Sequence, residues 1–331
     1  MRLLACTRCV VGLRQRTCFL AKREQWWNLV PARSASAPAL RALTRRPQLR
    51  EALQLGSLPA HSPAARYATD ACLCRYLRAR AWDVGKAQKM LQASLKWRAV
   101  SGVDALRYSE VQAECATGKM HRLHCRDRKG RPVLVLRPAL ENTREAKGQI
   151  RFLTWNMEAL MRAMPKGQGG FPLGADVDLA TEQMMLLVDF TGYSIFNAPP
   201  TKTSMETLHI MLNHYPERLG SAVCLSAPTL FTVVYAMMQP FMDARTVAKI
   251  HFVDASSAAG LAQLNSLVDL SRLHMSLGGT GTEGGAWDAA AYDARALAEE
   301  QAFRNAEEQA KAELRRMQAE ATGPAAAATS S

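Results

Sequence analysis

The sequence predicts an α/β protein in which a mainly parallel sheet follows a small helical module. Two patterns lead to this prediction. Met184–Phe190 is apolar at nearly every position, as in a strand that is covered on both faces. Strand-like segments and segments with helical periodicity then alternate along the chain, which is the order expected of β-α-β units.

Residues 1–66 are interpreted as a basic leader and linker. The first 50 residues contain eleven Lys/Arg and one acid, Glu24, so this segment carries +10 of the net charge of +13. Because the basic excess is confined to one segment and is not spread over a folded face, we expect no nucleic-acid partner. Enrichment in Arg, Leu, Ala and Ser is typical of a mitochondrial or plastid transit peptide, and a disordered basic tail is the alternative.

Residues 67–112 are predicted to form the helical module. Helical periodicity begins at Asp70, and Asp83 is placed to cap the start of a second helix, which Gly102 ends. The eight cysteines of the whole chain show no paired framework, which favours reduced thiols inside a cell.

Residues 113–279 are predicted to contain the sheet. A β-rich run, Val133–Leu136, is stopped by Pro138. The further elements expected in this segment are a helix at Glu145–Met164, the strand Met184–Phe190, a helix at Thr203–His214, a strand at Ala222–Pro228, an apolar helix at Leu230–Met242, a strand at Ala248–Asp254 and a helix at Ala259–Leu267.

Residues 280–331 are interpreted as a glycine linker, a charged helix and a disordered tail. The Ala-rich stretch Asp288–Glu320 reads as a solvent-exposed helix, or as one packed through a narrow stripe that contains Leu297 and Phe303. A protein partner that binds through this helix is one expectation.

Thr229–Met242 is the most informative segment because it has no charged residue. A helix that is apolar around most of its circumference is either buried on all sides or faces lipid. It is therefore a core helix or a lid over an apolar cavity, with Pro240 and the turn Asp243–Thr246 as the bend and hinge. No apolar run in the chain reaches the roughly 18–20 residues that cross a bilayer, so we expect a soluble protein.

Several motifs resemble, in the right order, those of the CRAL-TRIO lipid-binding family. The segment LCRYLRARAWDVGKAQKMLQASLKWRAVSGVD is similar to the helical N-terminal module of that family. GRPVLVL, LLVDFTGYS, YPERLG, SAPTLF and QPFMDARTVAKIHFV are similar to successive landmarks of its α/β domain. The resemblance covers about Asp70–Gly279 and implies a CRAL-TRIO-like sheet with an apolar lipid pocket closed by a gate helix.

The resemblance also implies roles for single residues. In the yeast family member that exchanges phosphatidylinositol and phosphatidylcholine, an Arg, a Glu and a Lys hold the inositol phosphate, and the matching residues here are Arg80, Glu217 and Lys249. The hydroxyl-bearing residues that hold choline lipid in that protein correspond to apolar residues here, which weakens the expectation of phosphatidylcholine binding. The expected lining of the pocket and gate is Leu123, Leu134, Met184, Leu186, Leu230, Phe231, Val234, Met238, Phe241 and Met242.

The function expected from these features is to bind one lipid, preferably phosphatidylinositol, and to transfer or present it between membranes. A carrier of a sterol-, retinoid- or tocopherol-like molecule and a lipid-sensing module that does not transfer remain alternatives. An enzyme is not expected, because Gly279–Gly284 fits GxGxxG without the preceding strand that a dinucleotide site needs. We therefore expect no catalytic residue, cofactor or metal, and a cytosolic protein in transient contact with a membrane surface.

Overall fold

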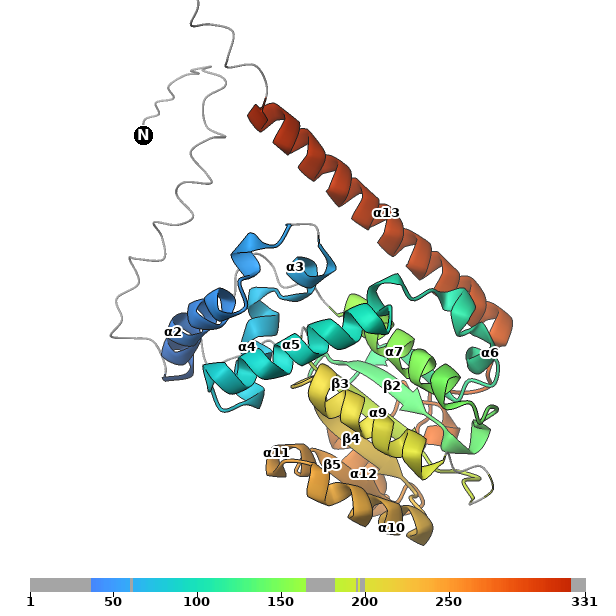
Figure 1. Ribbon diagram of the computed structural model, residues 1–331. Coiled ribbons are helices and arrows are strands. Elements are labelled where there is room, and N and C mark those ends of the chain that lie inside the picture. The colour runs from blue at the N-terminus through green and yellow to red at the C-terminus, as the bar shows by residue number, and fades with distance from the viewer. Residues whose placement is uncertain (1–36, 60–61, 165–181, 195, 197–199, 323–331) are drawn as a thin grey trace, which may run out of the picture.

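The computed structural model describes residues 37–59, 62–164, 182–194, 196 and 200–322 of the 331-residue chain. Five strands form one sheet in the order β1-β2-β3-β4-β5 (Figure 1). β1 is antiparallel to β2, and the other neighbouring strands are parallel. The mainly parallel α/β fold is thus confirmed, with strands β1 (Met120–Arg126), β2 (Pro132–Leu136), β3 (Met184–Asp189), β4 (Leu219–Leu225) and β5 (Ile250–Val253).

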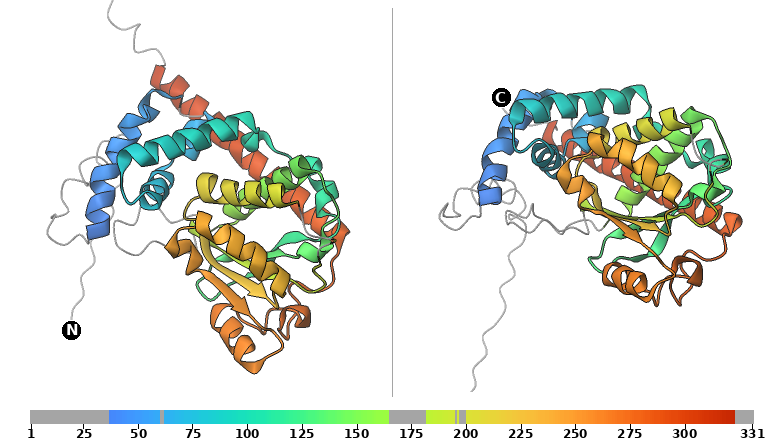
Figure 2. Two further views of the ribbon diagram at one scale, coloured as in Figure 1. Left: turned by 60° about the horizontal axis from the view of Figure 1, so that its bottom comes forward. Right: turned by 90° about the horizontal axis from the view of Figure 1, so that it is seen from below.

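Three crossover helices lie on one face of the sheet. α7 (Ala146–Arg162), α9 (Thr201–His214) and α10 (Thr229–Met238) follow β2, β3 and β4 in turn. Successive strands add to the sheet in one direction, so right-handed connections place all three helices on the same side. Figure 2 shows this layer and, across the sheet, helix α12 (Ala258–Leu267).

Side chains alternate between the two faces of the sheet and belong to separate cores. Val135, Leu187 and Val223 are completely buried in the core that contains α12, with Leu264 and Leu273. On the opposite face, α7 and α9 cover only part of the sheet. They form a second core with it, whose buried members are Leu134, Leu153, Met157, Leu160, Met164, Met184, Ile210 and Tyr215.

The helical module contains α2 (Ala37–Ala52), α3 (Pro63–Tyr67), α4 (Asp70–Ala79) and α5 (Val84–Val100). Asp83 caps α5 as predicted, because its carboxylate accepts a hydrogen bond from Lys86 N at 2.9 Å.

The described part of the segment interpreted as leader and linker contains the helix α2, the turn η2 and most of α3. α2 has only weak helical amphipathicity and contains Pro47, so its pattern alone does not predict a helix. Burial of Leu49 in the core of the module, together with α4 and α5, stabilises it. Residues 1–36, on which the leader prediction rests, lie outside the described residues.

The module packs onto the sheet domain through aromatic and polar contacts. The ring of Trp97 in α5 stacks on His214 at the end of α9, with ring centroids 4.4 Å apart. Ser94 lies 3.0 Å from Nδ1 of the same histidine. The remaining short elements are η2 (Leu55–Ser57), η3 (Val103–Ala105), η4 (Tyr108–Glu110), α6 (Gln112–Cys115), η5 (Pro138–Leu140), η7 (Gln239–Phe241), α11 (Ala244–Val247) and η8 (Met275–Leu277).

The predicted C-terminal helix is present and mostly exposed, but two details of this region differ from the prediction. The glycine segment forms β-bridges to Leu273 and His274 and is therefore part of the fold and not a free linker. The long helix α13 (Ala289–Thr322) packs through Tyr292 and Ala296, whereas Leu297 and Phe303 are exposed. The distal part of α13 extends away from the sheet (Figure 1), and binding of a protein partner there stays a prediction.

None of the helices that the structure describes combines the length and the hydrophobicity that crossing a bilayer requires.

Candidate functional site

A cavity of about 620 Å³ lies between the sheet and the layer that contains α9 and α10. This is the face that α7 and α9 cover only in part, so the inner sides of the strands remain open to the cavity. The volume is within the range of sites that bind small organic molecules. Apolar residues line the cavity near the middle of the strands, and polar residues line it near both ends of the strands.

The apolar middle follows from the register of the strands. Leu186, Ala222 and Ile250 are neighbours across β3, β4 and β5, and Val188 and Cys224 form the next row on the same face. All five line the cavity. Burial raises the pKa of the Cys224 thiol to about 12, so this thiol is neutral and acts as a small apolar group.

α10 forms the opposite wall and is apolar on both of its sides. Phe231, Val234 and Met238 face the cavity at helical spacing, joined by Met242 after the helix. The solvent-facing part of this region is also apolar: Val233 is 56% exposed, Met237, which also lines the cavity, is 55% exposed, and Phe241 in the turn after α10 is 62% exposed.

α10 is shorter than the predicted Leu230–Met242. It ends at Met238, and the 3₁₀ turn η7 follows, because Pro240 has no N–H to continue the helical hydrogen bonds. Asp243 then caps α11 by accepting hydrogen bonds from Arg245 N and Thr246 N. Burial alone would raise the pKa of Asp243, but the hydrogen bonds from Thr246 and the nearby Arg245 lower it.

Five charged residues gather where β4 and β5 begin, and we call them the cationic end of the cavity: Arg80, Glu217, Asp243, Arg245 and Lys249. Arg80 caps the C-terminus of α4, whereas Glu217 and Lys249 precede β4 and β5. The structure therefore brings the three predicted headgroup residues to one end of one cavity. With three cations and two carboxylates, this end has a net charge of +1.

The cations of this end are weakly paired within the described part of the chain. The Lys249 ammonium donates to the Leu219 carbonyl at 2.8 Å, and Arg80 donates to the Ala79 carbonyl at 3.1 Å. Neither forms an ion pair with a described carboxylate. Arg245 lies 3.5 Å from the Glu217 carboxylate and is 61% exposed. The positive charge therefore remains available to an anionic group.

Glu217 has a left-handed backbone conformation, with φ of 59°. This region is unfavourable for a residue with a Cβ atom, and such strain is often found at ligand-binding positions. The Glu217 side chain lines the cavity and is largely buried.

Four residues expected in the pocket and gate lie outside the cavity lining. Leu123 faces the α12 core across the sheet, because side chains on β1 alternate between the two faces. Leu134 and Met184 are on the cavity side but are covered by α7 and α9. Phe241 is in η7 and is exposed. The Leu230 side chain lies outside the described part of the chain.

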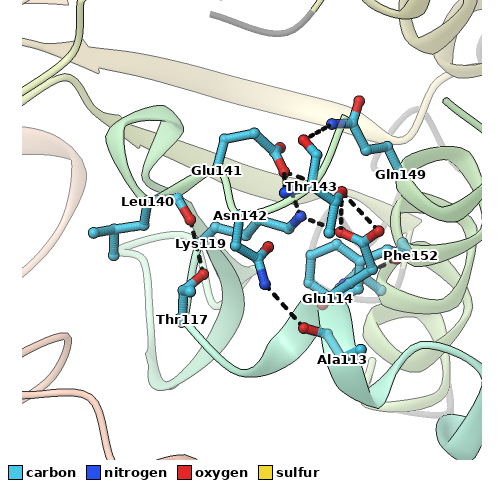
Figure 3. A network of polar contacts seen from close by, with 11 residues as sticks. Ala113, Glu114, Thr117, Lys119, Leu140, Glu141, Asn142, Thr143, Gln149 and Phe152 are labelled. Carbon is cyan, nitrogen blue, oxygen red and sulfur yellow. Dashed lines mark hydrogen bonds and ion pairs between the residues drawn. The ribbon is translucent and has the colours of Figure 1, made fainter. Parts of the chain in front are cut away.

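The opposite end of the cavity is polar in a different way (Figure 3). Lys119 precedes β1, and Glu141 follows β2, so both lie at the carboxyl end of the parallel strands. The Lys119 ammonium is paired with Glu114 and donates to Glu141 at 2.6 Å. Gln149, in the first turn of α7, donates through Nε2 to the Thr143 carbonyl at 2.8 Å. We call Glu114, Lys119, Glu141, Thr143 and Gln149 the network end.

The sequence did not point to several residues that line the cavity. Arg245 lies in the predicted hinge Asp243–Thr246, but its position 3.5 Å from the Glu217 carboxylate depends on how α11 packs. Gln149 and Thr203 open two predicted helices, and nothing in their local pattern distinguishes them from solvent-facing residues. Their position at the carboxyl edge of adjacent parallel strands was the signal that could have identified them.

Comparison with known families identifies this architecture. The CRAL/TRIO domain matches residues 117–279, and the CRAL/TRIO N-terminal domain matches residues 59–93. The chain therefore belongs to the CRAL-TRIO family.

The relatives include one whose name states phosphatidylinositol transfer. The chain is 32% identical over 193 residues to the phosphatidylinositol transfer protein PDR17 of Saccharomyces cerevisiae, which covers 55% of this chain and 51% of that protein. It is 29% identical over 198 residues to the SEC14 cytosolic factor of Eremothecium gossypii, over 56% of this chain and 62% of the other. The chain thus spans about half to three fifths of the length of these relatives.

Two further comparisons extend the picture. A CRAL-TRIO domain-containing protein of Schizosaccharomyces pombe is 32% identical over 246 residues, which is 68% of this chain and 23% of that protein. A crystal structure of Sfh5 matches with a TM-score of 0.53 and 16% sequence identity, over 67% of this chain and 83% of that chain. The structural match shows the shared fold.

Proposed function

We propose that this protein binds one phosphatidylinositol molecule in the cavity beneath α10 and transfers it between membranes, without catalysing a reaction. The proposal depends on one observation: the cavity beneath the uncharged helix α10 has apolar walls and a cationic end. The relative PDR17, whose name states phosphatidylinositol transfer, supports the same ligand.

The cationic end has the chemistry that an inositol phosphate requires. Arg80 and Lys249 can pair with a phosphodiester because their present partners are backbone carbonyls. The Glu217 carboxylate can accept hydrogen bonds from inositol hydroxyls. A phosphate beside three cations and two carboxylates would lower the net charge of this end toward zero.

The apolar chamber gives the acyl chains an alternative to the bilayer interior. Moving hydrocarbon into water costs about 0.8 kcal/mol per CH₂, so a two-chain lipid meets a barrier of many kcal/mol without such a chamber. Val188, Cys224 and Val234 provide apolar walls. The exposed apolar side of α10 would lie against the membrane during loading, and peripheral membrane association of a cytosolic protein follows from this proposal.

Exchange of labelled phosphatidylinositol between two vesicle populations tests the proposal. Lys249→Ala and Glu217→Ala should each reduce the exchange rate about tenfold, equivalent to about 1.4 kcal/mol of lost interaction with the headgroup. Lys96→Ala is the matched control, because Lys96 is an exposed lysine of α5 outside the cavity. Exchange at the wild-type rate in both cavity variants, with folding intact by circular dichroism, would contradict the headgroup assignment.

Binding must be separated from transfer. A lipid-sensing module would retain labelled phosphatidylinositol without passing it to acceptor vesicles. Measuring bound lipid after gel filtration beside the exchange rate distinguishes the two, because a carrier shows both and a sensor shows only binding.

A further inference from the structure

The network end contains polar groups that the phosphatidylinositol proposal leaves without a role. It lies at the carboxyl end of the strands, whereas the cationic end lies where β4 and β5 begin. β4 has seven residues, so the two ends are separated by about 20 Å at the usual rise per residue. A headgroup held at the cationic end therefore does not reach the network end.

Most hydrogen-bonding groups at the network end are satisfied within the protein. The Glu141 carboxylate accepts bonds from Lys119 and from Thr143 N, and the Thr143 hydroxyl donates to Glu114 (Figure 3). The carbonyl acceptor Thr143 O fixes the orientation of the Gln149 amide, because only its Nε2 can donate. Figure 3 shows the Gln149 oxygen turned away from this network.

Two cavity-lining polar groups have no hydrogen-bond partner among the described residues. The first is Oε1 of Gln149, whose residue is 8% exposed. The second is the hydroxyl of Thr203, which is 3% exposed. Gln149 and Thr203 open α7 and α9, which pack side by side after the adjacent strands β2 and β3. Both groups therefore reach the cavity at the same end of the sheet.

We propose that Gln149 and Thr203 form a subsite for a hydroxyl group of the bound lipid. Gln149 Oε1 can only accept a hydrogen bond, and the Thr203 hydroxyl can donate or accept one, so a lipid hydroxyl can bond to both. A phosphate has no proton to offer Gln149 and would lie beside a network that has two carboxylates and one ammonium. A plain acyl chain packed against these two cavity-facing groups would exclude water and leave both unpaired, which is unfavourable.

This inference rests on the proposed lipid-binding function and specifies the ligand class further. The hydroxyl could belong to a lipid alcohol, such as a sterol or prenol, or to a hydroxylated acyl chain of a phospholipid. In the first case the cationic end is not used. In the second case one lipid contacts both ends.

Competition against bound fluorescent phosphatidylinositol tests the subsite with matched lipid pairs. One arm compares cholesterol with 5-cholestene, which lacks the hydroxyl. The other compares phosphatidylinositol carrying 12-hydroxystearoyl chains with its stearoyl counterpart. We expect the hydroxylated member of at least one pair to compete about threefold to tenfold better, which is the range for one or two satisfied hydrogen bonds.

Two variants should remove this preference without loss of folding. Thr203→Val removes a hydroxyl that has no partner in the described part of the chain, and Gln149→Leu removes the acceptor. Each should bring the ratio within a pair below about twofold. The controls Thr154→Val and Gln88→Leu should retain the preference, because these side chains bond to backbone carbonyls outside the cavity.

The outcomes separate this subsite from the proposed function. Equal competition within both pairs, or a preference that survives both Thr203→Val and Gln149→Leu, would overturn the subsite. Phosphatidylinositol exchange that still depends on Lys249 would then leave the proposed function standing. Failure of every lipid, including 5-cholestene, to enter the protein would overturn both.

Discussion

The two polar ends of the cavity use charge in opposite ways. At the network end the Lys119 ammonium is paired with two carboxylates, and its side chain is only 4% exposed. At the cationic end Lys249 and Arg80 bond only to backbone carbonyls among the described residues, and Arg245 is mostly exposed. Each charged side chain of the network end therefore has an oppositely charged partner, whereas Lys249 and Arg80 have none among the described residues.

We infer that the charged residues of the network end stabilise the fold, whereas those of the cationic end are available to bind a ligand. Buried charges are tolerated when they are paired and hydrogen-bonded, and removing one partner leaves the other desolvated and alone. Charges near solvent contribute little to stability and are free to bind. Variants at the network end should therefore affect unfolding, and variants at the cationic end should affect lipid affinity.

The largest effect is expected from Lys119→Met. This change leaves the buried Glu114 carboxylate and the half-buried Glu141 carboxylate without their cation and should lower the free energy of unfolding by about 3–5 kcal/mol. Urea denaturation measures the change. Lys249→Met is the matched control and should cost less than about 1 kcal/mol. Equal losses in both variants would remove the distinction between the ends.

Acid should destabilise the protein through His121, the second residue of β1. Burial, with Arg137 and Arg295 nearby, lowers the pKa of His121 from 6.5 to about 4. Between these pH values the unfolded chain binds the proton and the folded chain does not, so stability is full above pH 6.5 and falls toward pH 4. This histidine should account for a loss of about 3 kcal/mol at most.

Urea denaturation of His121→Asn at pH 7 and pH 4.5 measures that contribution. The variant should lose less stability between the two pH values than the wild type does. His214 adds an effect of the same sign, because burial also lowers its pKa to about 4. His251→Asn is the control and should behave like the wild type, because His251 lies in β5, at the opposite edge of the sheet from His121. A wild-type pH dependence in His121→Asn would contradict the prediction.

Most of the fold could be predicted because its signals are local. Apolar strands such as Met184–Asp189 and the Asp83 cap can be identified within a few residues of sequence. α2 and β1 could not be predicted, because α2 is stabilised by contacts with α4 and α5, and β1 by pairing with β2. The packing of α13 through Tyr292 also depends on a distant cluster around Tyr108.

The residues of the candidate site that lie in recognisable sequence motifs could be predicted. Arg80, Glu217 and Lys249 were expected from family resemblance, and all three line one end of the cavity. Local sequence did not reveal which face of β1 Leu123 occupies, nor that α7 and α9 cover Leu134. The network end could not be predicted, because Lys119 and Gln149 join one hydrogen-bond network only when separate elements pack together.

The backbone of Glu217 offers a smaller effect at the cationic end. Its φ of 59° is strained for any residue with a Cβ atom, so Glu217→Gly should be about 1 kcal/mol more stable than Glu217→Ala. Both variants lack the carboxylate, and their difference isolates the backbone. Thermal or urea unfolding measures it. If the glycine variant were the less stable one, the left-handed conformation would not be a cost imposed by the fold.

The smallest effect is expected from Arg245→Ala. Arg245 lies 3.5 Å from Glu217 but is 61% exposed, so its charge is screened and should contribute less than about 1 kcal/mol to binding. We expect phosphatidylinositol affinity to fall about threefold at low salt and the difference to shrink at 0.5 M salt, where the Debye length is a few Å. Stability should not change. Equilibrium binding to labelled lipid at both salt concentrations tests this. A loss of affinity of tenfold or more that does not depend on salt would contradict the prediction. It would mean that Arg245 contacts the headgroup directly, as proposed for Lys249.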